Sequence, residues 1–342
     1  MPKPKFSFFR FFSWLVAALA AVLVAAGIGV YYYLHAPLDL PEETVDFVIE
    51  PGSSVRKVAA TINEAGIELP PDVLVAYARL TGIQTRIQAG GYALKRGESL
   101  MDLFRKLDQA DVTQRQILFV EGWNLRQIRA ALAAHPDVRQ TLQGVGNDQL
   151  GTRVGAPVEH GEGLFFPDTY LFSVGTTDLE ILKRAFHAQQ RVLEDAWAQR
   201  DEGLPLRSPY EALILASIIE KETGREADRN AVAGVFINRL RAGMLLQTDP
   251  TVIYGVGETF DGNLTRLHLR TDTPWNTYTR AGLPPTPIAA VGRPSIQPAL
   301  QPEKHGYYYF VARGDGTSQF SKNLADHNRA VRTYQLKRRT QP

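Results

Sequence analysis

One segment near the N-terminus limits what this chain can fold into more than any other feature. Residues 11–34 read FFSWLVAALAAVLVAAGIGVYYYL and contain no charged residue. The run is long enough for the about 20 residues that a helix needs to cross a hydrocarbon core of about 30 Å. Because almost nothing in it is suited to face water, the segment predicts a membrane-spanning helix rather than a helix of a soluble protein.

The flanking charges predict the orientation of this helix. Lys3, Lys5 and Arg10 precede it, and acidic residues follow it. Since basic residues stay on the cytoplasmic side, residues 1–10 are expected to form a cytoplasmic tail and everything after Leu34 to lie outside. A cleaved signal peptide is the alternative, but its apolar core is about 7–15 residues and a small-residue cleavage site follows it. We therefore predict an uncleaved single-pass anchor.

Composition excludes several kinds of site. The chain has no cysteine, so disulfides, cysteine ligands for zinc and thiol nucleophiles are absent. Its net charge of +2 comes from interspersed charges without a dense basic stripe, which argues against nucleic acid as a ligand. His305 and His327 stand in no metal-ligand motif. No metal and no cofactor are predicted.

A short pattern recurs three times after the anchor, starting near Val45, Tyr92 and Ile117. Each copy is a strand-like segment, a glycine turn, a Ser or Asn suited to helix capping, and apolar residues at helical spacing. The first copy, VIEPGSSVRKVAATINEAG, resembles a LysM repeat, which binds N-acetylated glycans; a purely structural unit is the alternative. We predict a linker over residues 35–44 and a LysM-like β/α module, or a pair of them, over residues 45–155.

From residue 156 the sequence changes character. Helical patterns cover residues 178–200, 208–224, 227–243 and 323–337, and residues 307–321 read as a hairpin. Residues 273–302 are rich in proline and glycine and are expected to have little regular structure, which inside a compact domain usually indicates function. Residues 156–342 are therefore predicted as a mixed α+β catalytic domain, and the whole chain belongs to the α+β class.

The helix that starts after Ser208 carries the most interesting side chain. Its run ALILASII is apolar on every side, which is typical of a buried helix, and its last turn holds Glu220 beside small residues. A buried carboxyl tends to keep its proton, as the general acid of glycosidic cleavage must. A surface carboxylate paired with a neighbouring cation is the alternative. Glu222 lies about 200° further around the helix, so the two are not expected to act as a pair.

Side chains suited to sugar binding stand in the segments around this helix. Amides, hydroxyls and aromatic rings satisfy sugar hydroxyls and cover the apolar faces of sugar rings. The candidates are Gln247 and Asp249 after the third helix, Asn276 and Tyr278 in the irregular stretch, and Glu162.

These segments, taken in order, resemble the endolytic murein transglycosylase family, also called the YceG-like or MltG family. The resemblance rests on EGLFFPDTY, LILASIIEKET, VFINRL, LLQTDPTVIYG, NTYTRAGLPP and YFVA, in this order within residues 160–335. One departure is Trp275, where a tyrosine is expected before NTY; the exchange keeps an aromatic ring. The family also has an N-terminal anchor and a LysM-like module, so the resemblance covers nearly the whole chain.

The resemblance implies a lytic transglycosylase acting on peptidoglycan, with Glu220 as its single acid and base. The carboxyl would protonate the oxygen leaving C1 of N-acetylmuramic acid and then take the proton of the C6 hydroxyl, which closes a 1,6-anhydro ring. The five sugar-binding candidates become substrate-binding residues. The family further implies cuts within nascent strands, a cell inner membrane location, a periplasmic catalytic domain, and peptidoglycan synthases (penicillin-binding proteins) as partners.

Two alternatives remain open at this point. A muramidase that uses water would need a second carboxylate, which Asp249, Glu162 or Asp168 could supply. A non-enzymatic cell-wall scaffold would bind peptidoglycan through the LysM-like module and would not depend on Glu220.

Overall fold

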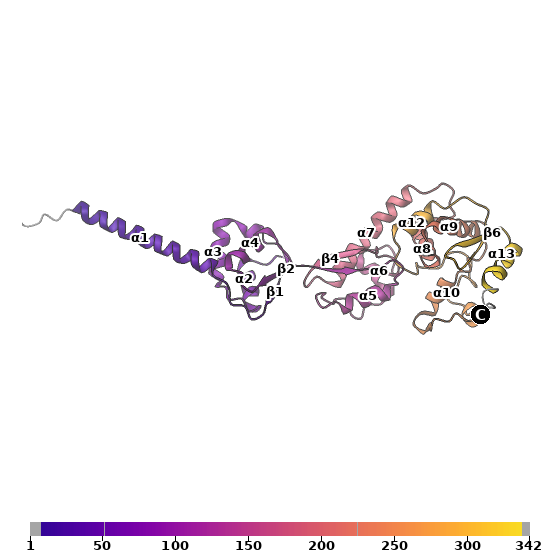
Figure 1. Ribbon diagram of the computed structural model, residues 1–342, viewed down its shortest axis with the longest axis horizontal. Helices are drawn as coiled ribbons and strands as arrows, with labels where there is room; N and C mark the ends of the chain where they lie inside the picture. Colours follow the sequence, from indigo (N-terminus) through magenta and orange to yellow (C-terminus); the bar gives the residue numbers. More distant parts are fainter. Residues whose placement is uncertain (1–7, 51, 224, 337–342) are drawn as a thin grey trace, which may run out of the picture. The chain divides into compact units, whose positions relative to one another are not determined.

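The computed structural model describes residues 8–50, 52–223 and 225–336. They form two compact units, of which the first holds the residues up to 115 with 173–176 and the second holds 116–172 with the residues from 177 onward (Figure 1). Most of the predicted cytoplasmic tail, including Lys3 and Lys5, lies outside the described residues.

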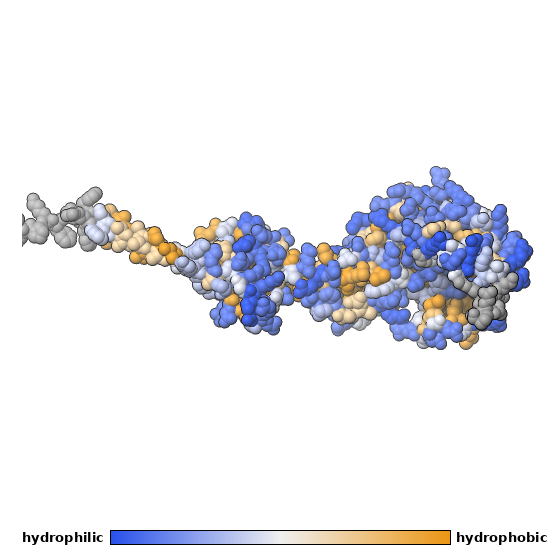
Figure 2. Space-filling model, in the orientation of Figure 1, coloured by the Kyte–Doolittle hydropathy of each residue, from blue (hydrophilic) through white to orange (hydrophobic). Residues whose placement is uncertain are grey.

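The first unit begins with helix α1, Phe8–His35. Its segment Phe12–His35 has a mean hydropathy of 2.3, is long enough to cross a membrane, and has no buried residue in its most apolar window. Figure 2 shows the apolar surface along this helix. Apolar side chains that the described residues leave exposed over most of this helix are consistent with the membrane anchor predicted over residues 11–34.

A small β/α module follows in the same unit. Its elements are β1 (Thr44–Ile49), α2 (Val55–Glu64), α3 (Pro71–Thr81), a 3₁₀ turn (Ile83–Thr85), β2 (Gly90–Lys95) and α4 (Leu100–Gln109). β1 and β2 pair antiparallel, with Val45 opposite Leu94 and Phe47 opposite Tyr92. All four of these side chains are buried, so one face of the ribbon closes the core against the helices.

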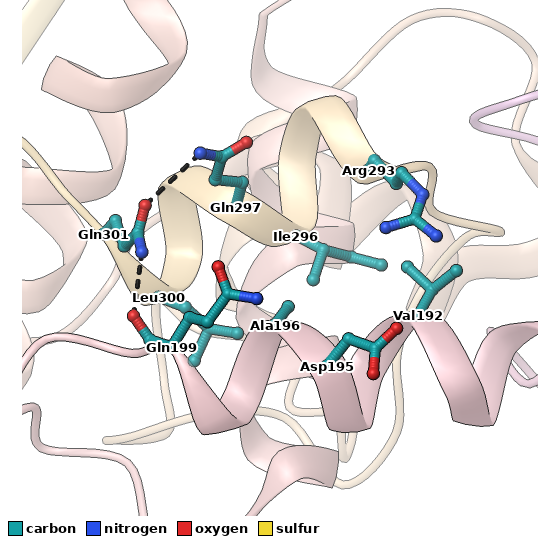
Figure 3. A pocket seen from close by; sticks show the side chains of 9 residues that line it. All are labelled: Val192, Asp195, Ala196, Gln199, Arg293, Ile296, Gln297, Leu300 and Gln301. Carbon is teal, nitrogen blue, oxygen red and sulfur yellow. Dashed lines mark hydrogen bonds between the residues drawn. The ribbon is translucent and has the colours of Figure 1, made fainter.

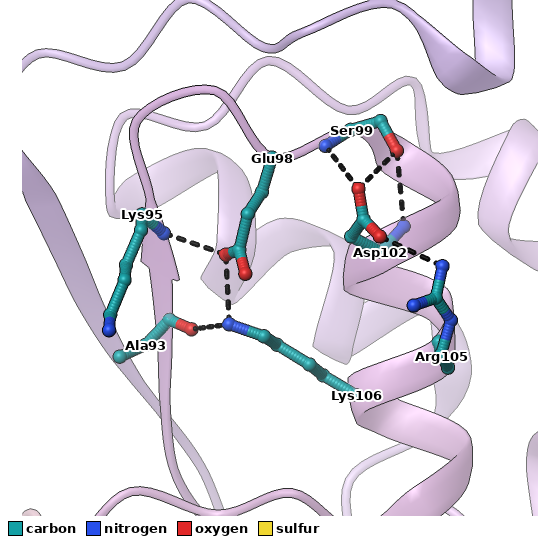
Figure 4. A network of polar contacts seen from close by, with 7 residues as sticks. All are labelled: Ala93, Lys95, Glu98, Ser99, Asp102, Arg105 and Lys106. Atoms are coloured by element: carbon teal, nitrogen blue, oxygen red, sulfur yellow. Dashed lines mark hydrogen bonds and ion pairs between the residues drawn. The ribbon is translucent and has the colours of Figure 1, made fainter.

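Polar contacts fix α4 against β2 in this module (Figure 4). Ser99 N donates to Asp102 Oδ2 at 2.9 Å and Asp102 N donates to Ser99 Oγ at 3.2 Å, a complete capping box. Lys106 Nζ donates to Ala93 O and to Glu98 Oε2, both at 2.8 Å. The contacts join the start of the helix to its own first turn and its middle to the neighbouring strand.

The three predicted strand–glycine–cap copies are present, but they are divided between the two units. Ser54, Ser99 and Asn124 each accept a backbone hydrogen bond as the N-cap of a helix. In the third copy, however, β3 (Gln114–Leu118) pairs with β4 (Thr169–Ser173) and not with β1 or β2. The compact units divide after residue 115, and the domain boundary after residue 155 stays a prediction.

The second unit is mainly helical. Its elements are α5 (Leu125–Ala134), α6 (Asn147–Val154), α7 (Asp178–Ala198), α8 (Pro209–Glu222), α9 (Glu226–Arg241), α10 (Asp249–Val256), a 3₁₀ turn (Gly257–Thr259), α11 (Arg266–Arg270), α12 (Arg293–Leu300), the hairpin β5 (Tyr309–Ala312) and β6 (Ser318–Ser321), α13 (Leu324–Val331) and a π-helical turn (Arg332–Leu336). The predicted α+β class is confirmed.

Helix α8 forms the centre of this unit. Every residue from Ala212 to Ile219 is buried, and α8 packs against α7, α9, α10 and α12. The apolar run therefore forms the buried helix that the sequence predicts.

The expectation of little regular structure over residues 273–302 was wrong at its end, where α12 begins at Arg293. Two prolines had argued against a helix. Pro294 occupies the first turn, where no backbone N–H is needed, and Pro298 is buried within the helix.

A core substitution in α8 tests the central position of this helix. Leu215 is fully buried, so Leu215→Ala is expected to lower the free energy of unfolding by about 2–5 kcal/mol. Leu267→Ala is the matched control, because Leu267 is 72% exposed and should change stability by no more than about 0.5 kcal/mol. Urea unfolding of the full-length protein in detergent, followed by tryptophan fluorescence, measures both; equal losses would contradict the central role of α8.

Candidate active site

Glu220 lies where α8 leaves the core. Its side chain is only 8% exposed. Ser295 Oγ donates to Glu220 Oε2 at 2.6 Å, and Arg229 Nη2 lies 3.8 Å from Glu220 Oε1. The carboxyl thus has one short hydrogen bond and one looser ionic contact in a largely dry environment, where both are stronger than in water.

Helices α9 and α12 bring these partners to Glu220. Arg229 is in the first turn of α9 and is 8% exposed, and its Nε has no hydrogen-bond partner among the described residues. Ser295 is in the first turn of α12 and is fully buried. The ends of three helices therefore meet at one carboxyl.

Helix α12 is held on its other face by α7 (Figure 3). Ile296 and Leu300 lie with Val192 and Ala196 of α7 around a hollow of about 130 Å³. At the end of the helix, Gln301 Nε2 donates to the backbone oxygen of Gln199 at 2.8 Å. This packing fixes the helix that carries Ser295.

A second carboxyl that the sequence analysis did not single out belongs to Glu121. It follows β3, and the next residues exchange backbone hydrogen bonds with Ala290: Gly122 N donates to Ala290 O at 2.9 Å, and Ala290 N donates to Trp123 O at 2.6 Å. Burial and the negative charge of Glu220 raise the pKa of Glu121, while Arg229 lowers it. Its position at a strand end before a glycine turn is the one sequence signal that could have indicated it.

A cleft of about 840 Å³ opens beside this site. Its lining residues are Gly122, Asn124, Arg126, Gln127, Asn147, Glu162, Lys221, Pro250, Ile253, Tyr254, Gly257, Glu258, Phe260, Trp275 and Ile288. The lining combines amides with aromatic rings, which suits a sugar chain. Glu220 is not among the lining residues, but its neighbour Lys221 is, and Lys221 Nζ donates to Gly122 O at 3.2 Å.

Glu162 lines this cleft but is itself only 2% exposed. Leu125 N donates to its two carboxyl oxygens at 3.0 and 3.1 Å, and Tyr254 OH donates to Oε2 at 3.0 Å. Burial raises the pKa of Glu162 to about 7, against the opposing effect of these hydrogen bonds. Its contacts tie α5 to α10 across the cleft.

Three other candidates gather on the side of Glu222, not on that of Glu220. Thr248 Oγ1 donates to Glu222, and burial raises the pKa of that carboxyl. Tyr278 OH donates to Asp249 Oδ1 at 2.6 Å. Gln247 is exposed, has a positive φ of 48°, and its N–H donates to Thr277 O at 3.1 Å. The two carboxyls of the last turn of α8 thus have separate partners, in line with their helical separation.

The last candidate, Asn276, is fully buried. Its Nδ2 donates to Thr271 O at 2.7 Å, and its Oδ1 accepts from Tyr278 N at 2.9 Å. These contacts shape the loop that carries Tyr278, and a direct contact of Asn276 with a substrate stays a prediction. In the part of the chain that the structure describes, no cluster of three or more His, Asp or Glu side chains could hold a metal ion.

Comparison with known proteins places the chain in a family. The model of the YceG-like family matches residues 47–333. The chain is 32% identical over 330 residues to the endolytic murein transglycosylase of Bacillus subtilis, with 90% of each chain covered. It is 27% identical to the endolytic murein transglycosylase of Streptococcus pneumoniae D39, with 91% of this chain and 63% of the relative covered.

A solved structure of a YceG-like protein is also similar to this chain. The crystal structure of a YceG-like protein from Listeria monocytogenes superimposes with a TM-score of 0.52 and 27% identity, covering 84% of this chain and 99% of that one. This chain belongs to the YceG-like family, which confirms the resemblance seen in its sequence motifs.

The raised pKa of Glu162 predicts a pH-dependent stability. The pKa of this carboxyl rises from an ordinary 4.5 in the unfolded chain to about 7 in the folded protein. Stability is therefore highest at low pH, where the carboxyl is protonated in both the folded and the unfolded state. The free energy of unfolding then falls as pH rises from 4.5 through 7. At about 1.4 kcal/mol per unit, the loss is on the order of 3 kcal/mol. Glu162→Gln, which stays neutral, should flatten this decline.

Urea unfolding of the full-length protein in detergent at pH 5 and pH 8 measures the effect. Glu194→Gln, at an exposed position on α7, is the control and should retain the wild-type decline. An equal decline in Glu162→Gln and wild type would show that Glu162 does not cause it.

Proposed function

We propose that this protein is a membrane-anchored lytic transglycosylase that cleaves within peptidoglycan glycan strands, between N-acetylmuramic acid and N-acetylglucosamine. Membership of the YceG-like family, and relatives named endolytic murein transglycosylase, support the activity. The observation that carries the proposal is the nearly buried Glu220 carboxyl, hydrogen-bonded by Ser295 at the end of the central helix.

The reaction needs one carboxyl that first gives and then takes a proton. Protonated Glu220 donates its proton to the oxygen leaving C1 of N-acetylmuramic acid, and the C1–O bond breaks. The C6 hydroxyl of the same sugar then bonds to C1 and gives its proton to Glu220, which leaves a 1,6-anhydro ring and restores the acid. No water is consumed.

The contacts of Glu220 suit both halves of this cycle. The Ser295 hydroxyl holds Oε2, which directs the other oxygen, Oε1, to the proton transfers. Arg229, 3.8 Å from Oε1, stabilises the negative charge that remains after the first transfer.

The cleft beside this site is proposed to hold the glycan strand. Tyr254, Phe260 and Trp275 offer rings to the apolar faces of the sugars, and Asn124 and Gln127 offer amides to hydroxyl and acetamido groups.

Of the five substrate-binding residues predicted from the sequence, Glu162 is the one that stands among the described residues lining this cleft. Glu162 joins its two walls. We propose that the exposed Gln247 and Asp249, with Tyr278, contact the strand further along, and that buried Asn276 holds their loop in place.

The membrane anchor would determine where the proposed cleavage takes place. We propose that α1 spans the cell inner membrane with its N-terminus in the cytoplasm and the catalytic unit in the periplasm. A site held near the membrane would cut strands as they emerge and so limit their length. The LysM-like module would bind glycan, and peptidoglycan synthases (penicillin-binding proteins) would be the partners.

A water-using muramidase is the second candidate. It would need a second carboxylate, and Glu121 supplies one whose pKa responds to the charge of Glu220. The sugar end that is released distinguishes the two reactions, because hydrolysis leaves a reducing end and transglycosylation an anhydro end.

Replacing the proposed acid tests both the activity and the site. Full-length protein in detergent is incubated with peptidoglycan that includes nascent, uncrosslinked strands, and the products are identified by mass spectrometry. Wild type is expected to release 1,6-anhydro ends, and Glu220→Gln is expected to lose at least about 10²-fold in rate because it removes the acid and base. Glu194→Gln is the control variant.

Three outcomes would contradict parts of this proposal. Reducing ends would identify a muramidase. If wild type released no sugar ends, a peptidoglycan-binding scaffold would be favoured. Full activity in Glu220→Gln would show that another residue acts as the acid.

The hydroxyl that holds Glu220 can be tested separately. Ser295→Ala removes a hydrogen bond to a charged group, worth about 1.5–3 kcal/mol, so turnover is expected to fall by about tenfold to a hundredfold with KM little changed. Steady-state release of anhydro ends measures both constants. Unchanged turnover would show that Ser295 does not position the acid.

A further inference from the structure

We propose that Glu121 is the second carboxyl of this active site and stabilises the positive charge that builds on C1 as the glycosidic bond breaks. The inference rests on the proposed function and goes beyond it, because the reaction as written needs Glu220 alone. It follows from how the structure holds Glu121 at the first turn of α12, the same turn that supplies Ser295 to Glu220.

The backbone fixes Glu121 close to Glu220. Gly122 and Trp123, directly after it, share two hydrogen bonds with Ala290, which stands shortly before α12. Gly122 O also accepts from Nζ of Lys221, the residue next to Glu220. The residue directly after the proposed acid is thereby joined to the residue that follows Glu121.

A glycine makes room for the carboxyl of Glu121. A Cβ placed on Gly292, the N-cap of α12, would lie 1.7 Å from Glu121 Oε1 and 2.7 Å from its Cδ. Gly292 has φ −88° and ψ 173°, a conformation open to any residue, so the backbone does not require glycine there. A side chain at this position would instead displace the carboxyl of Glu121.

The charges around Glu121 act on it in opposite directions. Glu220 repels it, Arg229 attracts it, and the positive end of α12 favours an anion at this place. A neutral side chain would avoid the repulsion between the two carboxyls. A carboxylate is useful here because the transition state of glycosidic cleavage resembles an oxocarbenium ion, a cation centred on C1.

Two properties together distinguish Glu121 from the other carboxyls considered: it is exposed, and the charge of Glu220 acts on it. It is exposed, whereas Glu162 is 2% exposed and tied to Leu125 and Tyr254. Asp249 and Glu222 have hydrogen-bond partners in a separate network. Of the described carboxyls, Glu121 is therefore the one we assign to act with Glu220.

A double-mutant cycle tests this assignment in the full-length protein. Glu121→Gln and Glu121→Ala are expected to lower kcat by about tenfold to a hundredfold, with KM changed less than about threefold, and products still ending in anhydro rings. Glu121→Asp should recover part of the loss because it keeps the charge. Gly292→Ala should lower kcat to a similar extent, because the new methyl group displaces the carboxyl.

A double variant at Glu121 and Gly292 distinguishes a role of Glu121 in the reaction from a role in folding. In a Glu121→Ala background, Gly292→Ala should have no further effect on kcat, since no carboxyl remains to be displaced. Urea unfolding midpoints of all variants are measured in parallel. Losses that multiply in the double variant, or that follow the unfolding midpoints, would overturn the assignment, as would wild-type kcat in Glu121→Gln.

The proposed function is judged by a different readout. Reducing ends from wild type, or full activity in Glu220→Gln, would refute the transglycosylase proposal while the coupling between Glu121 and Gly292 still reports on the second carboxyl. Anhydro ends with wild-type kcat in Glu121→Gln would leave the function standing and refute this inference.

Discussion

The burial of α8 is the constraint on which the structure of the second unit depends. A helix with apolar residues on every side must be covered on every side, and α7, α9, α10 and α12 provide that cover. The same packing brings the ends of α9 and α12 to the last turn of α8, where Arg229 and Ser295 meet Glu220. The candidate site therefore results from core packing, which gives its side chains the rigidity that the proposed proton transfer needs.

The irregular stretch before α12 is tied to the same helix. Ser217, in the middle of α8, accepts a hydrogen bond from Ile288 N at 3.0 Å through a fully buried hydroxyl. Two residues later Ala290 binds the segment after Glu121, and α12 follows. One polar residue in an apolar helix thus fixes a loop that has little regular structure of its own, and that loop positions both ends of the site.

The sequence allowed prediction of features that repeat locally. The buried helix, the caps at Ser54, Ser99 and Asn124, and the α+β class all follow from spacing within one segment. It did not indicate Glu121 or Ser295, because their meaning comes from contacts with Glu220 made by distant segments. The pairing of β3 with β4 could not be predicted for the same reason, because it joins segments far apart in the sequence.

The role of acid and base proposed for Glu220 needs contacts that tolerate both of its charge states. Ser295 places a neutral hydroxyl on one oxygen of Glu220, and Arg229 lies 3.8 Å from the other. Glu121, proposed as the second carboxyl, is repelled by the charge of Glu220 and attracted by that of Arg229. The loose pairing of Arg229 with Glu220 has a cost in stability. In the proposed reaction it leaves the negative charge of the carboxyls available to a cationic transition state.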